Sequence, residues 1–204
     1  MNYEHLASEE TIEKVVAVLK ERNINAIVVG TKAEALEKIK SLIPAGGEVM
    51  NGSSATLQEI GFVDYLKEGK HGWGNVHEAI LAEKDSMRQT KLRKQSILAD
   101  YFLGSVHAVT EAGQLLVASA SGSQVPSFAF SSNNIIWVVG TQKIVPDLDT
   151  AMKRLQEHVF PLENKRMQEA GYPGSVIAKI LIIEREIMPN RHATVIFVKE
   201  KLGF

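Results

Sequence analysis

The sequence contains no cysteine among its 204 residues. This absence excludes disulfide bonds, catalysis by a thiolate, and zinc or iron–sulfur centres held by cysteine ligands. Long apolar runs are also missing, because the longest ones, residues 134–139 and 178–183, fall far short of the roughly 18 residues that cross a bilayer. The N-terminal residues have no basic segment followed by an apolar stretch, which is the pattern of a secretory signal. We therefore expect a cytoplasmic protein that does not enter the membrane.

An excess of charge of one sign is missing as well. Lys and Arg number 23 and Asp and Glu 24, which gives a formal net charge of −1. This balance provides no global field that would attract nucleic acid or an anionic membrane surface. The hydrophobic fraction of 45% and the charged fraction of 23% are those of an ordinary globular protein. Because no repeat or linker is visible, we expect residues 1–204 to form a single domain.

Several helices and strands can be located from the spacing of apolar residues. Ser8 is suited to cap a first helix, and further helices are expected over residues 32–42, over residues 79–98 and after Asp147. The apolar run at residues 26–30 is typical of a strand buried on both faces. Shorter buried strands are expected at residues 48–50 and 135–140, and a helix is expected to follow residue 124 and reach Phe130.

The second half of the chain contains signals for antiparallel pairing. Residues 100–110 and 114–118 predict a hairpin that turns at Glu111–Gly113. The late runs 176–183 and 193–199, joined by a polar turn, indicate antiparallel strands added to a mainly parallel sheet. The fold class that these elements predict is α/β with a mainly parallel sheet and C-terminal antiparallel strands.

The strongest local signal for function follows the strand at residues 48–50. Gly52 permits a tight turn there, and Ser53, Ser54 and Thr56 stand where the next helix begins. Backbone N–H groups at a helix start, with the positive end of the helix dipole, favour an anion such as phosphate or carboxylate. The alternative is that Ser53 or Ser54 only caps the helix, which requires no ligand. The sequence leaves both interpretations open.

A second transition from strand to helix, at residues 119–124, has the same character. Gly122, Ser123 and Gln124 lie in it, and the alternative is a tight connection that needs small residues. In open α/β sheets ligands bind at the carboxyl ends of the strands, where the two loops are expected to lie side by side. Lys143 follows a third strand and would add a positive charge at the same edge. These residues predict a binding site for a small anionic metabolite.

Glu111 is the carboxylate closest in sequence to these loops. If it points inward it can serve as a base or nucleophile, whereas a carboxylate at a hairpin turn is otherwise exposed to solvent. His107 lies in a strand near the expected site, where a packed histidine is more common than a general base. His71 and His77 do not have the spacing of a metal site, so we predict neither a metal ion nor another cofactor.

Four segments, ordered along nearly the whole chain, resemble the LUD (lactate utilisation) domain family, in particular its LutC-like members. They are residues 52–61, 100–113, 137–147 and 198–204. The chain departs from the pattern at His107, where many members have Asn. It also lacks the cysteine-rich iron–sulfur modules of the larger family proteins.

The resemblance implies a three-layer α/β/α sandwich like that of ribose-5-phosphate isomerases, glucosamine-6-phosphate deaminases and CoA-transferases. In those proteins, loops similar to residues 52–56 and 122–124 hold phosphate or pantetheine, and a carboxylate acts as base or nucleophile. Glu111 matches that carboxylate in approximate position only.

Three functions stay open, because a fold does not fix a reaction. The first is a cluster-free protein that supports utilisation of lactate or another small organic acid, as an accessory to iron–sulfur partner subunits. The second is a stand-alone enzyme, similar to a sugar-phosphate isomerase or an acyl or CoA-transferase, that uses Glu111. The third is a sensor that binds an anionic metabolite without turning it over. We also expect a homo-oligomer, with Val195, Phe197 and residues 202–204 as contacts, because the apolar C-terminal strands need covering.

Overall fold

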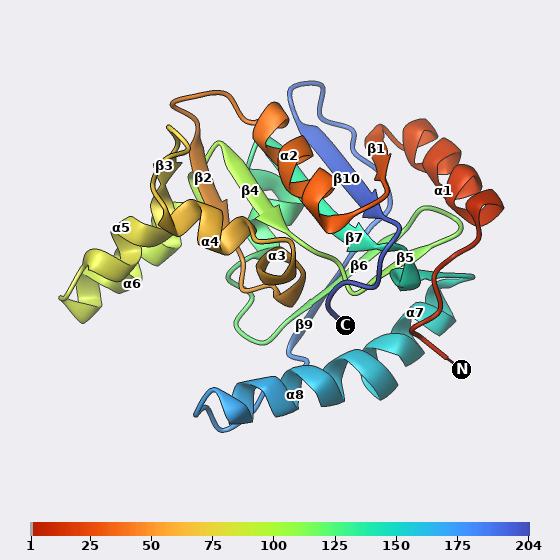
Figure 1. Ribbon diagram of the computed structural model, residues 1–204. Coiled ribbons are helices and arrows are strands. Elements are labelled where there is room, and N and C mark those ends of the chain that lie inside the picture. Colours follow the sequence, from red (N-terminus) through yellow and green to blue (C-terminus); the bar gives the residue numbers. More distant parts are fainter. Residues whose placement is uncertain (1) are drawn as a thin grey trace.

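The computed structural model describes residues 2–204 and is built around a six-stranded sheet (Figure 1). The strands lie in the order β1-β10-β7-β4-β2-β3, and every neighbouring pair is parallel. Their bounds are β1 (Ile24–Val29), β2 (Glu48–Asn51), β3 (Gly74–Asn75), β4 (Tyr101–Gly104), β7 (Asn134–Gly140) and β10 (His192–Val198). The mainly parallel α/β architecture predicted from the sequence is confirmed.

Two neighbouring inner strands of this sheet, β7 and β10, are buried on both faces. In β7, Trp137 and Val139 belong to the core on one side of the sheet, and Ile136 and Val138 belong to the core on the other. Successive side chains of a strand point to opposite faces, so an uninterrupted apolar run such as residues 135–139 supplies both cores. This run, together with that of β10, places the sheet at the centre of the molecule.

Helices and a second sheet cover the two faces. One face packs against α2 (Lys32–Leu42), α3 (Ala55–Glu59) and α4 (Phe62–Lys67). The other face packs against α1 (Glu9–Glu21), whose N-cap is Ser8 as expected, and against the four-stranded sheet. Two further helices, α5 (Val76–Ala82) and α6 (Ser86–Gln95), extend beyond the β3 edge (Figure 1).

The second sheet has the order β8-β5-β6-β9. Its strands are β5 (Ala108–Thr110), β6 (Leu115–Ser119), β8 (Ile144–Val145) and β9 (Lys179–Ile183). The antiparallel pairing of β5 with β6 confirms the predicted hairpin. A long helical segment covers the outer face of this sheet, formed by α7 (Leu148–Arg154), the π-helical turn η4 (Leu155–Val159) and α8 (Phe160–Glu169). Taken together, the layers confirm the predicted three-layer α/β/α fold.

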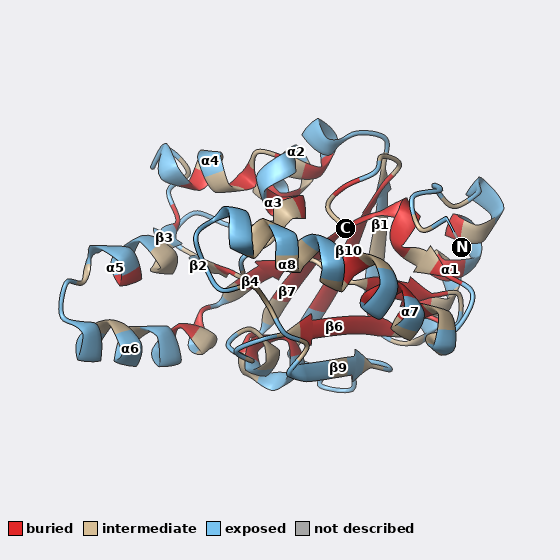
Figure 2. Cartoon of the chain, turned by 90° about the horizontal axis from the view of Figure 1, so that it is seen from below, coloured by how far each residue is buried: buried red, intermediate tan, exposed pale blue. Residues whose placement is uncertain are grey.

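The late strands do not pair with each other as the sequence suggested. β9 is antiparallel, but to β6 at the edge of the second sheet, where Figure 2 shows it exposed beside the buried β6. β10 instead lies between β1 and β7 and runs parallel to both. Conversely, β1 was expected to be buried on both faces but is an edge strand with mostly half-exposed residues. An apolar run therefore predicts a strand, without showing how deeply that strand is buried or which strands it pairs with.

Two helix predictions also differ from the structure. The helix expected over residues 79–98 is two helices, because Glu83 has extended backbone and Asp85 caps α6 anew. The helix expected to reach Phe130 is present over residues 125–131, but most of it is the π-helical turn η2 (Ser127–Ser131) rather than α-helix.

The residues expected to cover an oligomer interface lie inside the monomer. Val195 and Phe197 are fully buried in the core next to β7, and Leu202 is 2% exposed. Phe204 packs at the edge of the core formed by α7 and the second sheet. β10 and the tail after it are covered by the chain itself, so an oligomer would have to use other surfaces, whereas β9 remains exposed at the edge of the second sheet.

Within residues 2–204, no helix combines the length and the apolar character that a membrane crossing requires.

Candidate functional site

A cleft of about 750 Å³ lies at the carboxyl ends of the central strands. Its lining residues follow β2 (Gly52–Thr56), β4 (Ser105–His107) and β7 (Lys143), and Phe204 joins them from the tail after β10. These four strands are neighbours in the sheet, so their ends converge on one place although the residues are far apart in sequence. This is the position at which open α/β sheets hold their ligands.

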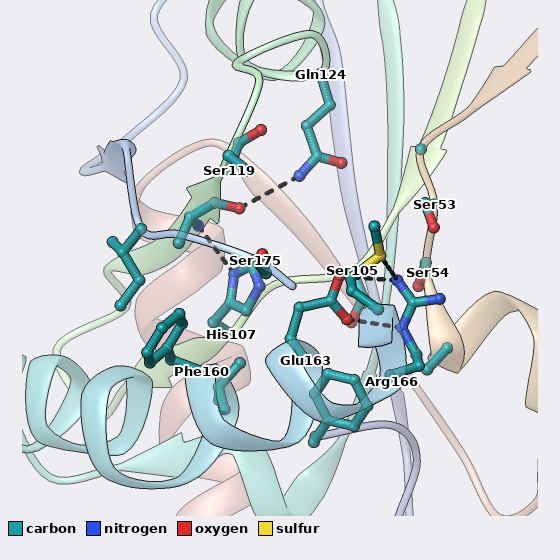
Figure 3. A pocket seen from close by; sticks show the side chains of 18 of the residues that line it. Ser53, Ser54, Ser105, His107, Ser119, Gln124, Phe160, Glu163, Arg166 and Ser175 are labelled. Atoms are coloured by element: carbon teal, nitrogen blue, oxygen red, sulfur yellow. Dashed lines mark hydrogen bonds and ion pairs between the residues drawn. The ribbon is translucent and has the colours of Figure 1, made fainter. Parts of the chain in front are cut away.

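The two Gly/Ser loops meet on one side of the cleft, as the sequence suggested. A Cβ added at Gly52 would lie 2.4 Å from Oε1 of Gln124, so the two loops are in close contact and a side chain at Gly52 would displace the end of Gln124. Gln124 is held in turn by a hydrogen bond of 3.4 Å from its Nε2 to the carbonyl of Ala118. Figure 3 shows Gln124 and Ser119 on this side of the cleft, with Glu163 and Arg166 of α8 opposite.

Lys143 provides a buried positive charge at the cleft. It is 2% exposed, and its Nζ donates hydrogen bonds of 3.1 Å each to Thr56 Oγ1 and Ser105 Oγ. Among residues 2–204 it forms no ion pair with a carboxylate within 4.0 Å. Burial lowers the pKa of Lys143 from its ordinary value of 10.5 to about 7, with a further lowering by the charge of Arg154. A nearby anion would reverse this shift, because opposite charge favours the protonated amine.

The C-terminal tail holds this arrangement in place. Nε2 of Gln142 donates a hydrogen bond of 2.8 Å to the carbonyl of Leu202. Gly203 has a φ of +57°, and a Cβ there would lie 2.5 Å from Thr56 Oγ1. Glycine is therefore required for the tail to pass over Thr56 and Lys143.

His107 is fixed as a neutral imidazole. Its Nδ1 accepts a hydrogen bond of 2.9 Å from the backbone N–H of Ala118, so Nδ1 cannot carry a proton without losing that bond. Burial, with smaller contributions from the charges of Lys143 and Arg154, lowers the pKa of His107 from 6.5 to about 3. The neutral ring carries its hydrogen on Nε2, which is the one polar hydrogen that this side chain can offer to a ligand. His107 is thus suited to donate a hydrogen bond rather than to act as a base.

In the first Gly/Ser loop, residues 52–56, the hydroxyl of Ser54 serves mainly to cap a helix. Ser54 Oγ accepts a hydrogen bond of 3.3 Å from the backbone N–H of Leu57 and is the N-cap of α3. α3 has only five residues, so its dipole contributes little to anion binding. Ser53 lines the cleft and is exposed. Of the two interpretations of this loop, the capping role holds for Ser54, and the charge in the cleft comes from Lys143.

The mouth of the cleft is also charged. Arg166 binds Glu163 through two hydrogen bonds of 2.7 and 2.8 Å, so these two side chains largely neutralise each other. Glu163 is the one acidic residue that lines the cleft within the described part of the chain. Arg93, on the basic face of α6, also reaches the lining.

Histidine and carboxylate side chains do not gather into a metal site anywhere in residues 2–204. His71 uses both ring nitrogens within the fold: Nε2 lies 3.0 Å from the carbonyl of Leu66, and Nδ1 accepts from the backbone N–H of Trp73.

The model of the LUD domain matches residues 12–198, which is nearly the whole chain. The chain belongs to the LUD-domain family. This membership supports a role associated with lactate utilisation in general, which is what the name of the family denotes. No curated protein matches this LUD-domain chain significantly.

A solved structure supports the fold of this LUD domain. The crystal structure of a DUF162 family protein from Deinococcus radiodurans superposes with a TM-score of 0.54 over 95% of this chain and 99% of that one. The two sequences are 14% identical, so the likeness concerns the fold alone.

Most of the site residues predicted from the sequence lie in the cleft of this LUD domain. They are Gly52, Ser53, Ser54, Thr56, His107, Ser123, Gln124 and Lys143. Gly122 is in the same loop, with a φ of +84°, but does not line the cleft. Glu111 also lies outside it, and its Oε2 forms an ion pair of 2.8 Å with Nζ of Lys14. Glu111 instead lines a separate, smaller hollow beside Gln142 and Ile144, so the structure does not bring it into the cleft with Lys143.

The wall of the cleft opposite the Gly/Ser loops was not predicted from the sequence. It is formed by η4 and α8, with Val159 and Phe160, and by residues 172–177. A signal was present, because Leu155 and Val159 continue the helical spacing of Leu148 and Met152. Pro161, which argues against a continuous helix, is accommodated in the first turn of α8 after the π-helical turn.

Proposed function

We propose that this LUD-domain protein binds the carboxylate of a small organic acid in the cleft. In this proposal it supports the utilisation of lactate or a related acid, as a LutC-like, cluster-free accessory to iron–sulfur partner subunits. The observation that carries the proposal is the environment of Lys143, a buried amine at a large cleft that has hydroxyl partners and, among residues 2–204, no carboxylate partner. Family membership supports the connection with lactate.

The physical argument concerns the cost of a buried charge. An ammonium group has three N–H donors, and the hydroxyls of Thr56 and Ser105 accept from two of them. A buried charge is costly unless it is paired, and charge-assisted hydrogen bonds to a carboxylate are the strong ones. A bound carboxylate would accept the third N–H and neutralise the charge, and the Nε2–H of His107 would add a second donor nearby. The arrangement favours an anion over a neutral ligand.

An isomerase or transferase mechanism that depends on Glu111 is less well supported. Glu111 pairs with Lys14 outside the cleft, and His107 is a donor rather than a base. Binding is therefore the function that we propose, and turnover is a separate question that a Glu163→Gln variant addresses, since Glu163 is the carboxylate in the lining.

Thermal-shift assays and calorimetry with L-lactate, pyruvate and inorganic phosphate test the proposal. A ligand that binds only the native state raises the melting temperature by mass action. We expect at least one carboxylate to stabilise the wild type and to lose its effect in Lys143→Met. Lys153→Met is the matched control, because Lys153 is an exposed lysine of α7 and does not line the cleft. An identical shift in Lys143→Met and wild type, or no shift with any of these anions, would overturn the proposal.

A further inference from the structure

The wall opposite the Gly/Ser loops is largely apolar. From η4 and α8 it presents Leu155, Val159, Phe160 and Met167, and from the segment before β9 it presents Val176 and Ile177. Figure 3 shows Phe160 on the helical segment that forms this wall. The cleft is therefore amphipathic: one side carries Lys143 and hydroxyl groups, and the other is apolar apart from the Glu163–Arg166 ion pair and Ser175.

The size of the cleft exceeds what a three-carbon acid needs. Pockets of about 300–1,000 Å³ enclose drug-sized ligands, and this cleft measures about 750 Å³. Lactate or pyruvate bound at Lys143 would fill a small part of that volume and leave the apolar wall in contact with water.

Two largely apolar side chains at the rim are exposed to solvent. Tyr172 is 60% exposed and Val176 is 61% exposed, although both border the cleft. Covering exposed apolar surface is favourable in proportion to its area, and contiguous apolar surface beside polar groups marks ligand-binding grooves. A ligand that reaches from Lys143 to this rim would cover both the wall and the rim.

We propose that the preferred ligand is an amphipathic organic acid, whose carboxylate lies at Lys143 and whose apolar chain of several carbons packs against Phe160 and Val176. This inference rests on the proposed function, because it uses the same carboxylate site. It adds a chemical class: straight-chain acids longer than lactate.

The test is a homologous series of straight-chain 2-hydroxy acids, from lactate to 2-hydroxyoctanoate, measured by calorimetry on the full chain. Each buried methylene is expected to increase affinity by up to about fourfold. In Val176→Asn and Phe160→Asn the increase per methylene should be smaller while lactate affinity is retained. Leu162→Asn is the matched control, since Leu162 lies on α8, is 38% exposed and does not line the cleft.

The outcomes separate the two proposals. Affinity that is independent of chain length, or a length dependence that is unchanged in both Asn variants, would overturn this inference and leave the proposed function standing. Failure of every acid in the series would overturn both. Binding of the longer acids that persists in Lys143→Met would show adsorption to the apolar wall without a carboxylate site, and would likewise overturn this inference.

Discussion

Lys143 and Arg154 are two buried cations that contact the same connection between β4 and β5. Lys143 donates to the hydroxyl of Ser105, and a terminal nitrogen of Arg154, Nη1, donates to the carbonyl of His107. Neither forms an ion pair within the described residues. Lys143 lines the cleft, however, whereas Arg154 is 0% exposed and does not.

The polar contacts of the two cations differ accordingly. Nζ of Lys143 has two hydroxyl partners and one donor left for a ligand. Nε and Nη2 of Arg154 are buried and have no hydrogen-bond partner within residues 2–204. Burial lowers the pKa of both, to about 7 for Lys143 and to about 10 for Arg154. The comparison teaches that burial and charge do not by themselves define a site. Access to a cavity is also needed.

The largest effect on stability is expected from truncation of Arg154. Arg154→Ala would leave a cavity between α7 and β5 and an unpaired His107 carbonyl, and we expect a loss of about 2–4 kcal/mol. Arg154→Met keeps most of the packing and removes two unpartnered donors, so its stability should stay within about 1 kcal/mol of wild type. Urea denaturation measures both. Equal stability of the two variants would show that packing of the side chain is not what Arg154 contributes.

Substitution of Lys143 is expected instead to change how the free energy of unfolding depends on pH. Its pKa is about 7 in the folded state against an ordinary 10.5, so between these pH values the unfolded chain holds a proton that the native protein lacks. Stability of the wild type should therefore rise with pH relative to Lys143→Met, by at most about 1.4 kcal/mol per pH unit. Below pH 7 the difference between the two proteins should be constant, with Lys143→Met the more stable.

Urea titrations of both proteins at several pH values between 6 and 10 provide the measurement. Arg154 and Glu59 are the charged groups that act on Lys143 in the native protein, and both are present in the variant as well. If the free energy of unfolding depended on pH in the same way in both proteins, the lowered pKa of Lys143 would be contradicted. The contrast between Lys143 at the cleft and the enclosed Arg154 would then no longer hold.

The smallest effect is expected in the loops beside the two cations. Ser54 caps α3, so Ser54→Ala should cost about 1 kcal/mol of stability. Ser121 bonds only within its own loop, to Ser123, and Ser121→Ala should be neutral within about 0.5 kcal/mol. Thermal unfolding of the two variants measures the difference. Equal effects would argue that the Ser54 hydroxyl contributes nothing to stability as a helix cap.

Part of the fold and of the site was predictable because the relevant signal is local. Gly52, Ser54 and Lys143 follow buried strands directly, and the parallel sheet brings the ends of such strands together. Glu111 is a counterexample. Its closeness in sequence to these loops did not predict the direction of its side chain, which extends from the turn at residues 111–113 to Lys14. The wall from η4 and α8 was missed because Pro161 masks a helical pattern that continues through a π-helical turn.

The sequence by itself determined the parallel α/β character, the small-residue loops and the presence of a lysine after β7. These depend on side-chain periodicity and turn chemistry, which neighbouring residues express without the rest of the chain. Only the tertiary structure decided that β10 lies inside the sheet, that Lys143 is buried without a counter-ion, and that the cleft has an apolar wall. Strand order, burial of a charge and the walls of a cavity arise from contacts between residues far apart in sequence, and many pairings of such strands satisfy the same local pattern.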